Sequence, residues 1–279
     1  MSGTLTLVAT PIGNLGDMSP RAVEALQNAD FIAAEDTRVT LKLLNHFDIK
    51  KPMVSYFEHN RAASGERILA RLLGGENCAL VTDAGMPAIS DPGEDMVRLC
   101  AENGIEVRII PGPCAAVCAL ALSGLPTGRF TFEGFLSTTK KSRFDHLQQL
   151  KEEQRTMVFL EAPHKLCSTL ADMLSVWGDR DITLSREITK LHEETLRMPL
   201  SQAVEYFNLT PPRGEFVLCV HGAEPPSGPE MDLNQALCVV ARHREEGLSL
   251  KDAAKRASEE TGFSKKQLYD AAVRAESKN

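Results

Sequence analysis

The sequence predicts an α/β fold: a mostly parallel sheet, a second α/β unit with a mixed sheet, and a small helical part at the C-terminus. Short apolar runs alternate with helix-length segments over residues 4–122, and a similar alternation follows over residues 124–222. A proline-rich stretch then precedes a helical pattern. The 279 residues are 43% apolar and 25% charged, which excludes a disordered or collagen-like chain and, at this length, favours two or three compact units.

The first expected domain, residues 1–123, contains five predicted strands. They are the apolar runs at residues 5–9, 31–34, 53–57, 78–82 and 107–110. Helix starts are predicted at Ser19, Asn60 and Asp91, where a capping side chain precedes the first turn, and helix ends at Gly74 and Gly104. This order of elements is typical of β-α units around a parallel sheet.

The second expected domain, residues 124–222, has strands predicted at residues 130–135, 157–161, 182–184, 195–198 and 216–220. Helices are expected near residues 142–153, 163–176 and 200–208, which predicts a mixed sheet. Residues 223–232 hold three prolines and a glycine, the composition of a linker. Residues 233–279 then read as three helices of a C-terminal helical domain, two of them opening at Ser249 and Ser264, with Gln267 completing a capping box.

Charge and hydropathy narrow the class of protein. The formal net charge is −7, which disfavours indiscriminate nucleic-acid binding, while the last fifty residues are neutral and carry lysine and arginine clusters that either contact phosphates or are solvated helix faces. Apolar runs long enough to span a membrane, and a secretory signal, are both missing, so a cytoplasmic protein without membrane contact is expected. The seven cysteines form no C-x-x-C pair and are expected to be buried thiols, with no metal site.

Ligands of an open α/β sheet bind beyond the carboxyl ends of its strands, so the loops there are the candidate site. Residues 10–17 contain two glycines but no G-x-G-x-x-G fingerprint. Residues 34–38 (AEDTR) are either a helix cap or part of a polar pocket. Residues 82–93 (TDAGMPAISDPG) are too elaborate for a simple connection: Asp83 could accept hydrogen bonds from an amine or a ribose hydroxyl, whereas Asp91 is predicted to cap a helix. Residues 111–116 form a rigid turn of small residues whose amides could hold a ligand.

Charged loops follow the strands of the second half as well. Residues 161–166 (EAPHKL), 185–194 (SREITKLHEE) and 213–215 (RGE) are either site loops or ion-pair networks, and the residues alone leave both interpretations open.

Eight segments taken together resemble one family. They are residues 11–15, 34–38, 82–93, 111–113, 134–136, 161–166, 186–190 and 213–218. In this order they are similar to the 16S ribosomal RNA 2′-O-ribose cytidine methyltransferases of the tetrapyrrole-methylase superfamily. The C-terminal helices resemble that family's C-terminal domain.

The resemblance implies a two-domain enzyme, usually a homodimer, that binds S-adenosylmethionine between its domains and methylates a cytidine ribose in the 16S rRNA of the small ribosomal subunit. The cofactor-binding residues that it implies are Pro11, Asp83, Gly85, Met86, Cys114, Ala115, Ala162, Pro163 and Gly214. The sequence departs from the family pattern at Ser137, Ala162 and Lys165, where proline, serine and arginine are more usual.

Methyl transfer to a ribose hydroxyl requires in-line geometry and a proton acceptor but no metal. Asp36, Glu187 or a desolvated Lys190 could assist the deprotonation, and Asp36 and Arg38 are the first candidates for contacts with the substrate. Two alternatives stay open at this point. One is a methylase of cobalamin or siroheme precursors, and the other is a non-catalytic protein that binds nucleotides or RNA.

Overall fold

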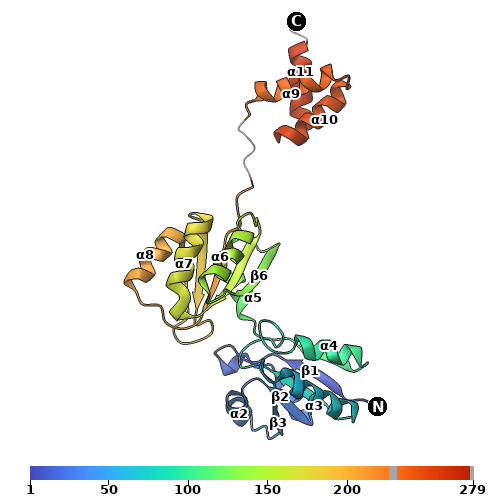
Figure 1. Ribbon diagram of the computed structural model, residues 1–279, viewed down its shortest axis with the longest axis vertical. Helices are drawn as coiled ribbons and strands as arrows, with labels where there is room; N and C mark the ends of the chain where they lie inside the picture. The colour runs from blue at the N-terminus through green and yellow to red at the C-terminus, as the bar shows by residue number, and fades with distance from the viewer. Residues whose placement is uncertain (226–230, 277–279) are drawn as a thin grey trace. The chain divides into compact units, whose positions relative to one another are not determined.

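The computed structural model describes residues 1–225 and 231–276. The chain divides into two compact units, Met1–Ala223 and Glu224–Asn279, and each is described by itself (Figure 1). Most of the predicted linker, at residues 226–230, lies outside the described residues.

The first sheet contains β1 (Thr4–Val8), β2 (Phe31–Ala34), β3 (Met53–Ser55), β4 (Cys78–Val81) and β5 (Glu106–Ile110). Its order is β3-β2-β4-β1-β5. Every pair is parallel, which agrees with the mostly parallel sheet that the sequence predicts. Parallel pairing places the carboxyl ends of β1, β2, β4 and β5 at one edge, so the loops that follow them meet there.

Helices cover both faces of this sheet because its strands are apolar on both sides. Phe31 and Ala33 pack into the core beneath α3 (Arg61–Leu73) and α4 (Glu94–Glu102). Their neighbours Ile32 and Ala34 point the other way, into the core beneath α1 (Pro20–Asn28) and α2 (Thr37–His46). This alternation with a period of two residues is what a strand buried on both faces requires.

The predicted helix starts meet different outcomes. Ser19 caps α1, and its hydroxyl accepts a hydrogen bond from the Ala22 amide. Asn60 precedes α3, but its side chain instead accepts from the Phe57 amide. The prediction that Asp91 caps a helix is wrong, because α4 begins three residues later, after Gly93.

The second sheet contains β6 (Phe130–Phe135), β7 (Thr156–Glu161), β8 (Asp181–Arg186), β9 (Glu194–Pro199) and β10 (Phe216–Val220). Its order is β6-β7-β10-β8-β9, with β6 and β7 parallel and the other pairs antiparallel, which confirms the predicted mixed sheet. One face packs against α6 (Lys140–Gln149), α7 (Pro163–Trp177) and α8 (Leu200–Leu209) (Figure 1).

The other face of the second sheet packs against α5 (Ala115–Ser123), which follows the last strand of the first sheet in sequence. Ala116, Ala119 and Leu120 of α5 lie against Val158, Val217 and Cys219. The chain therefore crosses from one sheet to the other ahead of α5, at residues 111–114, whereas the sequence pattern places the change at residue 124.

The C-terminal unit contains α9 (Leu233–Glu245), α10 (Leu250–Thr261) and α11 (Lys265–Glu276). Its core consists mainly of alanines, which allow a close approach of helices: Ala236, Val240, Ala253, Ala254, Ala257, Leu268 and Ala272. The predicted capping box at Ser264 is present. The backbone N–H of Gln267 donates to Ser264 Oγ, and the side-chain oxygen of Gln267 accepts from the backbone N–H of Ser264.

Cys78, Cys100 and Cys219 are buried thiols as predicted, but Cys167 and Cys238 are exposed and correct that expectation. Across the described parts of the chain, every helix is too short or too polar to cross a bilayer.

Candidate functional site

A cleft of about 390 Å³ within the first compact unit is lined from both sheets. The first sheet contributes the ends of β2 and β4 and the loops after β1 and β5, and the second contributes β6, the end of β7, the loop after β8 and the start of β10. This volume lies within the usual range of small-molecule sites, and most of the lining is apolar.

The loop after β4 carries the polar groups on the first-sheet side. It is fixed to the loop after β1 by a two-residue bridge, in which the amides and carbonyls of Thr10 and Gly85 exchange hydrogen bonds of 2.9 and 3.1 Å. Ala88 and Ser90 have φ values of +65° and +61°, which side-chain-bearing residues rarely adopt. Such backbone strain is typical of functional loops.

Three carboxyl groups, from Glu35, Asp83 and Asp91, line this side of the cleft. Glu35 accepts a 2.6 Å hydrogen bond from the Thr82 hydroxyl, and Asp83 accepts a 3.0 Å hydrogen bond from the Asp36 amide. Burial, assisted by the charge of Glu35, raises the pKa of Asp91 to about 6. Burial also raises the pKa of Asp83, again with the charges of neighbouring carboxylates.

The opposite side holds a charged group from the loop after β8. Lys190 Nζ lies 3.0 Å from Glu187 Oε1 and 3.5 Å from Glu215 Oε2. Glu187 has a φ of +51°. A Cβ on Gly214 would lie only 2.6 Å from Glu187 Cγ, so position 214 requires glycine. A Cβ on Gly13 would lie 2.4 Å from Lys190 Cγ, which shows how tightly the loop after β1 packs on this group.

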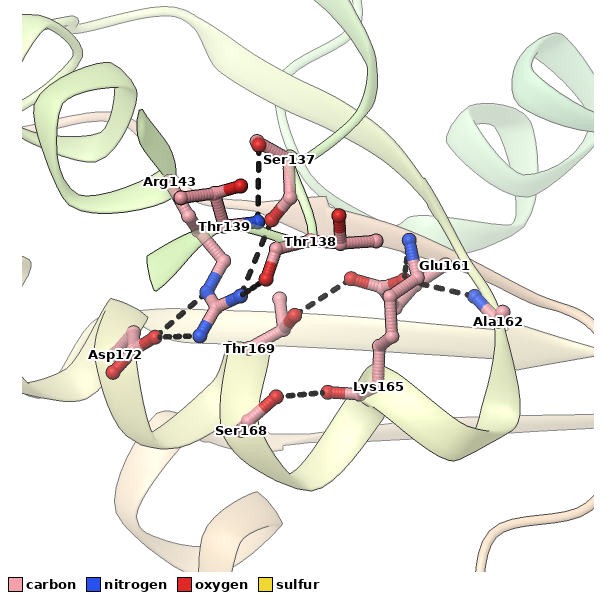
Figure 2. A network of polar contacts seen from close by, with 10 residues as sticks. All are labelled: Ser137, Thr138, Thr139, Arg143, Glu161, Ala162, Lys165, Ser168, Thr169 and Asp172. Atoms are coloured by element: carbon pink, nitrogen blue, oxygen red, sulfur yellow. Dashed lines mark hydrogen bonds and ion pairs between the residues drawn. The ribbon is translucent and has the colours of Figure 1, made fainter. Parts of the chain in front are cut away.

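A buried polar network supports the β7 edge of the cleft, and Figure 2 shows it. Glu161, 2% exposed, accepts hydrogen bonds from the Thr169 hydroxyl (2.6 Å) and the Ala162 amide (2.9 Å), and its carboxylate lies 3.1 Å from Lys165 Nζ. Lys165 Nζ also lies over the ring of Phe135, another lining residue of the cleft. The network therefore fixes both Glu161 and the chain at Ala162.

A second part of this network anchors the turn after β6. Arg143 Nε donates a 2.7 Å hydrogen bond to Asp172, and Arg143 Nη1 donates to the carbonyls of Ser137 and Thr138 at 3.2 and 3.4 Å (Figure 2). Arg143 and Asp172 are both nearly buried, so the attraction between them offsets the cost of removing each charge from water.

The structure brings together most of the residues expected to bind a cofactor. The residues that line the cleft are Asp83, Gly85, Met86, Cys114, Ala115 and Ala162. Pro163 and Gly214 are not among its lining residues, although their neighbours Ala162 and Glu215 are. Pro11 lines a second cavity, against α2.

The four residues expected at the substrate separate into two groups. Glu187 and Lys190 line the cleft, whereas Asp36 and Arg38 lie outside it at the start of α2. Asp36 caps that helix through the Arg38 amide, and its carboxylate pairs with the Arg38 guanidinium at 2.6 Å. The Arg38 side chain is 88% exposed, so solvent weakens this ion pair.

The expected proton acceptors have pKa shifts that work against that role. Hydrogen bonds from Arg38 lower the pKa of Asp36 to about 2. Burial alone would raise the pKa of Glu187 and lower that of Lys190, but their mutual hydrogen bond, contacts with Glu215 and the neighbouring charges together outweigh burial, so the pKa of Glu187 is lowered and that of Lys190 is raised. Asp83 and Asp91, with raised pKa values, are the better acceptors.

Sequence reasoning placed Glu35 and Glu161 in candidate site loops without naming either as a site residue, and it assigned Asp91 to a helix cap. Glu35 and Glu161 each stand at or just after the end of a buried strand, a signal that could have identified them. Among the described residues, the carboxyl groups do not form a cluster arranged to hold a metal ion.

Comparisons with known proteins agree with this geometry. Residues 4–204 match the family Tetrapyrrole (Corrin/Porphyrin) Methylases. The chain belongs to this family. Residues 233–276 match a second family, described as the RsmI C-terminal HTH domain.

Relatives of similar sequence cover all or most of this chain. The chain is 48% identical to "Ribosomal RNA small subunit methyltransferase I" of Synechocystis over 98% of this chain and 99% of that protein. A protein of the same name from Thermotoga maritima is 47% identical over 80% of this chain and 100% of that protein, so about a fifth of this chain has no counterpart there.

Solved structures share the fold at low identity. Diphthine synthase superposes with a TM-score of 0.60 at 15% identity, over 79% of this chain and 90% of that one. Uroporphyrin-III C-methyltransferase from Thermus thermophilus, in complex with S-adenosyl homocysteine, superposes with a TM-score of 0.55 at 17% identity, over 78% and 97%. The predicted fold class is thereby confirmed.

The raised pKa of Asp91 predicts a pH-dependent effect of Asp91→Asn. Below the ordinary aspartate pKa of 3.8 the carboxyl is protonated in the folded and unfolded states alike. Between pH 3.8 and about 6 the unfolded chain ionises this carboxyl while the buried group in the folded protein keeps its proton, so the free energy of unfolding falls over that interval and stays level above it. Thermal unfolding should therefore show a gain in Tm for Asp91→Asn near pH ~7.5 that shrinks near pH ~4. An equal difference at both pH values would contradict the shift.

Proposed function

We propose that this chain is an S-adenosylmethionine-dependent methyltransferase that modifies the ribose 2′-hydroxyl of a cytidine in the 16S rRNA of the small ribosomal subunit. The observation that carries the proposal is near-full-length identity of 42–48% to proteins named as small-subunit rRNA methyltransferases. The cleft lies where such a fold binds its ligand, at the carboxyl ends of parallel strands.

The cleft fits the cofactor chemically. S-adenosylmethionine carries an ammonium and a sulfonium charge, and three carboxyl groups face the cleft from the first sheet. Gly85, Ala115 and Ala162 leave room for a ligand against the backbone, while Met86 and Cys114 offer apolar contact. Pro163 and Gly214 would act indirectly, by shaping the chain beside Ala162 and Glu215.

When bound, the cofactor supplies a methyl group on a sulfonium sulfur. On transfer, that methyl group would form a carbon–oxygen bond to the ribose, and the sulfur would keep the electron pair of the broken carbon–sulfur bond. The hydroxyl proton passes to a carboxylate of this chain, for which Asp83 and Asp91 are suited because their raised pKa values bring them closer to neutrality. The cleft walls hold the reacting atoms in line.

Substrate contact is assigned to the remaining polar groups. Arg38, exposed at the start of α2, would meet an RNA phosphate, with Asp36 orienting its guanidinium. Glu187 and Lys190, which line the cleft, would contact the substrate as charged groups and would not accept its proton.

A homodimer and a cytoplasmic location stay predictions. Exposed apolar side chains on consecutive elements β5, α5 and β6 support the first: Ile109, Val117, Leu122 and Phe130.

The direct test supplies labelled S-adenosylmethionine to the protein together with small ribosomal subunits that lack the modification. We expect label in 16S rRNA, on the ribose of one cytidine, as nuclease digestion and mass spectrometry would show. Cofactor binding without transfer to RNA would contradict the proposal, as would transfer to a tetrapyrrole precursor supplied in a parallel reaction.

Asp83→Ala should weaken cofactor binding by about 10- to 100-fold, the effect of losing one hydrogen bond to a charged group. Calorimetry with S-adenosylmethionine gives the Kd. Asp83 also holds the Asp36 amide, so Asp83→Asn, which keeps an acceptor for that amide, is the control for a local collapse. An unchanged Kd in a folded Asp83→Ala protein would remove Asp83 from the site.

Arg38→Lys should lower methylation of RNA because lysine cannot donate two parallel hydrogen bonds to a phosphate. Its ion pair with Asp36 is exposed, so Tm and the cofactor Kd should stay near wild-type values. A parallel fall in Tm, cofactor affinity and turnover would instead indicate a role limited to ordering Asp36.

The C-terminal helices are proposed to hold RNA. Every residue that lines the cleft belongs to Met1–Ala223, so cofactor binding should not require the second compact unit. Lys265 and Lys266 are exposed at the start of α11, whereas Arg242 is paired with Glu260. Truncation before residue 224 should preserve the cofactor Kd and raise the KM for small subunits. A wild-type KM across a range of salt concentrations would assign the helices another role.

A further inference from the structure

A second cavity, of about 260 Å³, lies against α2 and beside the cofactor cleft. It is bounded by the loop after β1, by α2 and by the end of β4. Its lining residues are Thr10, Pro11, Gly13, Leu15, Val39, Thr40, Lys42, Leu43, Thr82 and Asp83.

Thr40 points to a ligand in this cavity. Its side chain is 3% exposed, and its hydroxyl has no hydrogen-bond partner among the residues that the structure describes. A buried hydroxyl without a partner destabilises the folded protein, whereas valine would fill the same space without that cost. The oxygen itself is almost fully covered, but Thr40 lines the cavity, so a turn of its side chain about the Cα–Cβ bond would present the hydroxyl to a polar group of an incoming molecule.

The rest of the lining suits a flat, partly apolar ligand attached to an anion. Pro11, Leu15, Val39 and Leu43 provide apolar surface, and Leu15 and Val39 are 43% and 39% exposed. Lys42 is the cation in the lining. A nucleobase meets apolar walls through its faces and polar groups through its edge, and it carries phosphates that a cation can neutralise.

The second cavity adjoins the cofactor cleft. Thr82 and Asp83 line both, and the loop after β1 borders both, with Ile12 in the cleft and Pro11 and Gly13 in the second cavity. A ligand in the second cavity and the contents of the cleft therefore both adjoin Asp83.

We propose that the second cavity receives the target pyrimidine nucleoside, turned out of the RNA strand, with Thr40 Oγ1 hydrogen-bonded to the base edge and the ribose facing Asp83. This rests on the proposed function and adds the binding site of the acceptor. An enzyme that modifies a nucleotide in folded RNA needs such a recess, because the reacting atom must reach the cofactor.

The hydroxyl is tested by Thr40→Val, with Thr40→Ser as the conservative control. Thr40→Val should raise the KM for small subunits about 3- to 10-fold, the effect of one neutral hydrogen bond, while the Kd for S-adenosylmethionine stays unchanged. Its Tm should be equal to or above wild type, because the unpaired hydroxyl is gone. Thr40→Ser should restore the KM. A wild-type KM for a folded Thr40→Val protein would overturn the proposal.

The space itself is tested on α2 with two matched substitutions. Val39→Trp fills the cavity, whereas Leu41→Trp places the same side chain at a neighbouring position that is 47% exposed and lines neither cavity. Val39→Trp should raise the KM for small subunits by about tenfold or more without changing the cofactor Kd, and Leu41→Trp should leave both unchanged. Equal effects of the two variants, or a normal KM for Val39→Trp, would overturn the proposal.

These outcomes separate the acceptor site from the proposed function. If wild-type protein methylates the 16S rRNA but the Thr40 and Val39 variants behave like wild type, the function stands and the nucleoside binds elsewhere. If wild-type protein transfers no methyl group to RNA, the proposed function itself fails.

Discussion

The site depends on the parallel pairing of β1, β2 and β4. Three strands that run side by side in one direction end at one edge, so Glu35, Thr82 and the loop after β1 become neighbours although up to 72 residues separate them in the chain. The hydrogen bonds from Thr10 Oγ1 to the Thr82 carbonyl and from Thr82 Oγ1 to Glu35 join all three. Both cavities are built on this edge.

Charge is distributed unequally around the cleft. The first sheet contributes Asp83 and Asp91, whose pKa values are raised by burial and by neighbouring carboxylates. The second contributes ions that are already paired, as in the Glu187–Lys190 and Glu161–Lys165 pairs. Paired ions are fixed in position and hold their charge, which suits binding and orientation. Crowded carboxyl groups attract a cationic ligand and accept protons more readily, which suits chemistry.

Backbone strain is concentrated at the same place. Of the five described residues other than glycine with positive φ, four lie in the loops that follow β4 and β8: Ala88, Ser90, Glu187 and Thr189. The surrounding contacts that fix them are strong, including the Thr10–Gly85 bridge and the packing of Lys190 on the loop after β1. The fold therefore holds these loops in shapes that their residues do not favour by themselves.

The sequence by itself determined the order of the strands along the chain, both sheet types and the loops that carry the site, because buried strands and helix caps leave local patterns of apolar, small and capping residues. It could not assign α5 to a sheet: Ala115–Ser123 is apolar almost throughout, so its pattern does not mark one face, and only packing on β7, β8 and β10 decides its place. Nor could it assign Asp36 and Asp91. Both stand near the start of a helix in sequence, but Asp36 became the cap and Asp91 became a cleft carboxyl, because the fold buries Asp91 beside the distant Glu35. The pKa of a carboxyl group depends on which groups the fold brings near it, and so does whether a hydroxyl such as that of Thr40 finds a hydrogen-bond partner. Tertiary structure alone decides both.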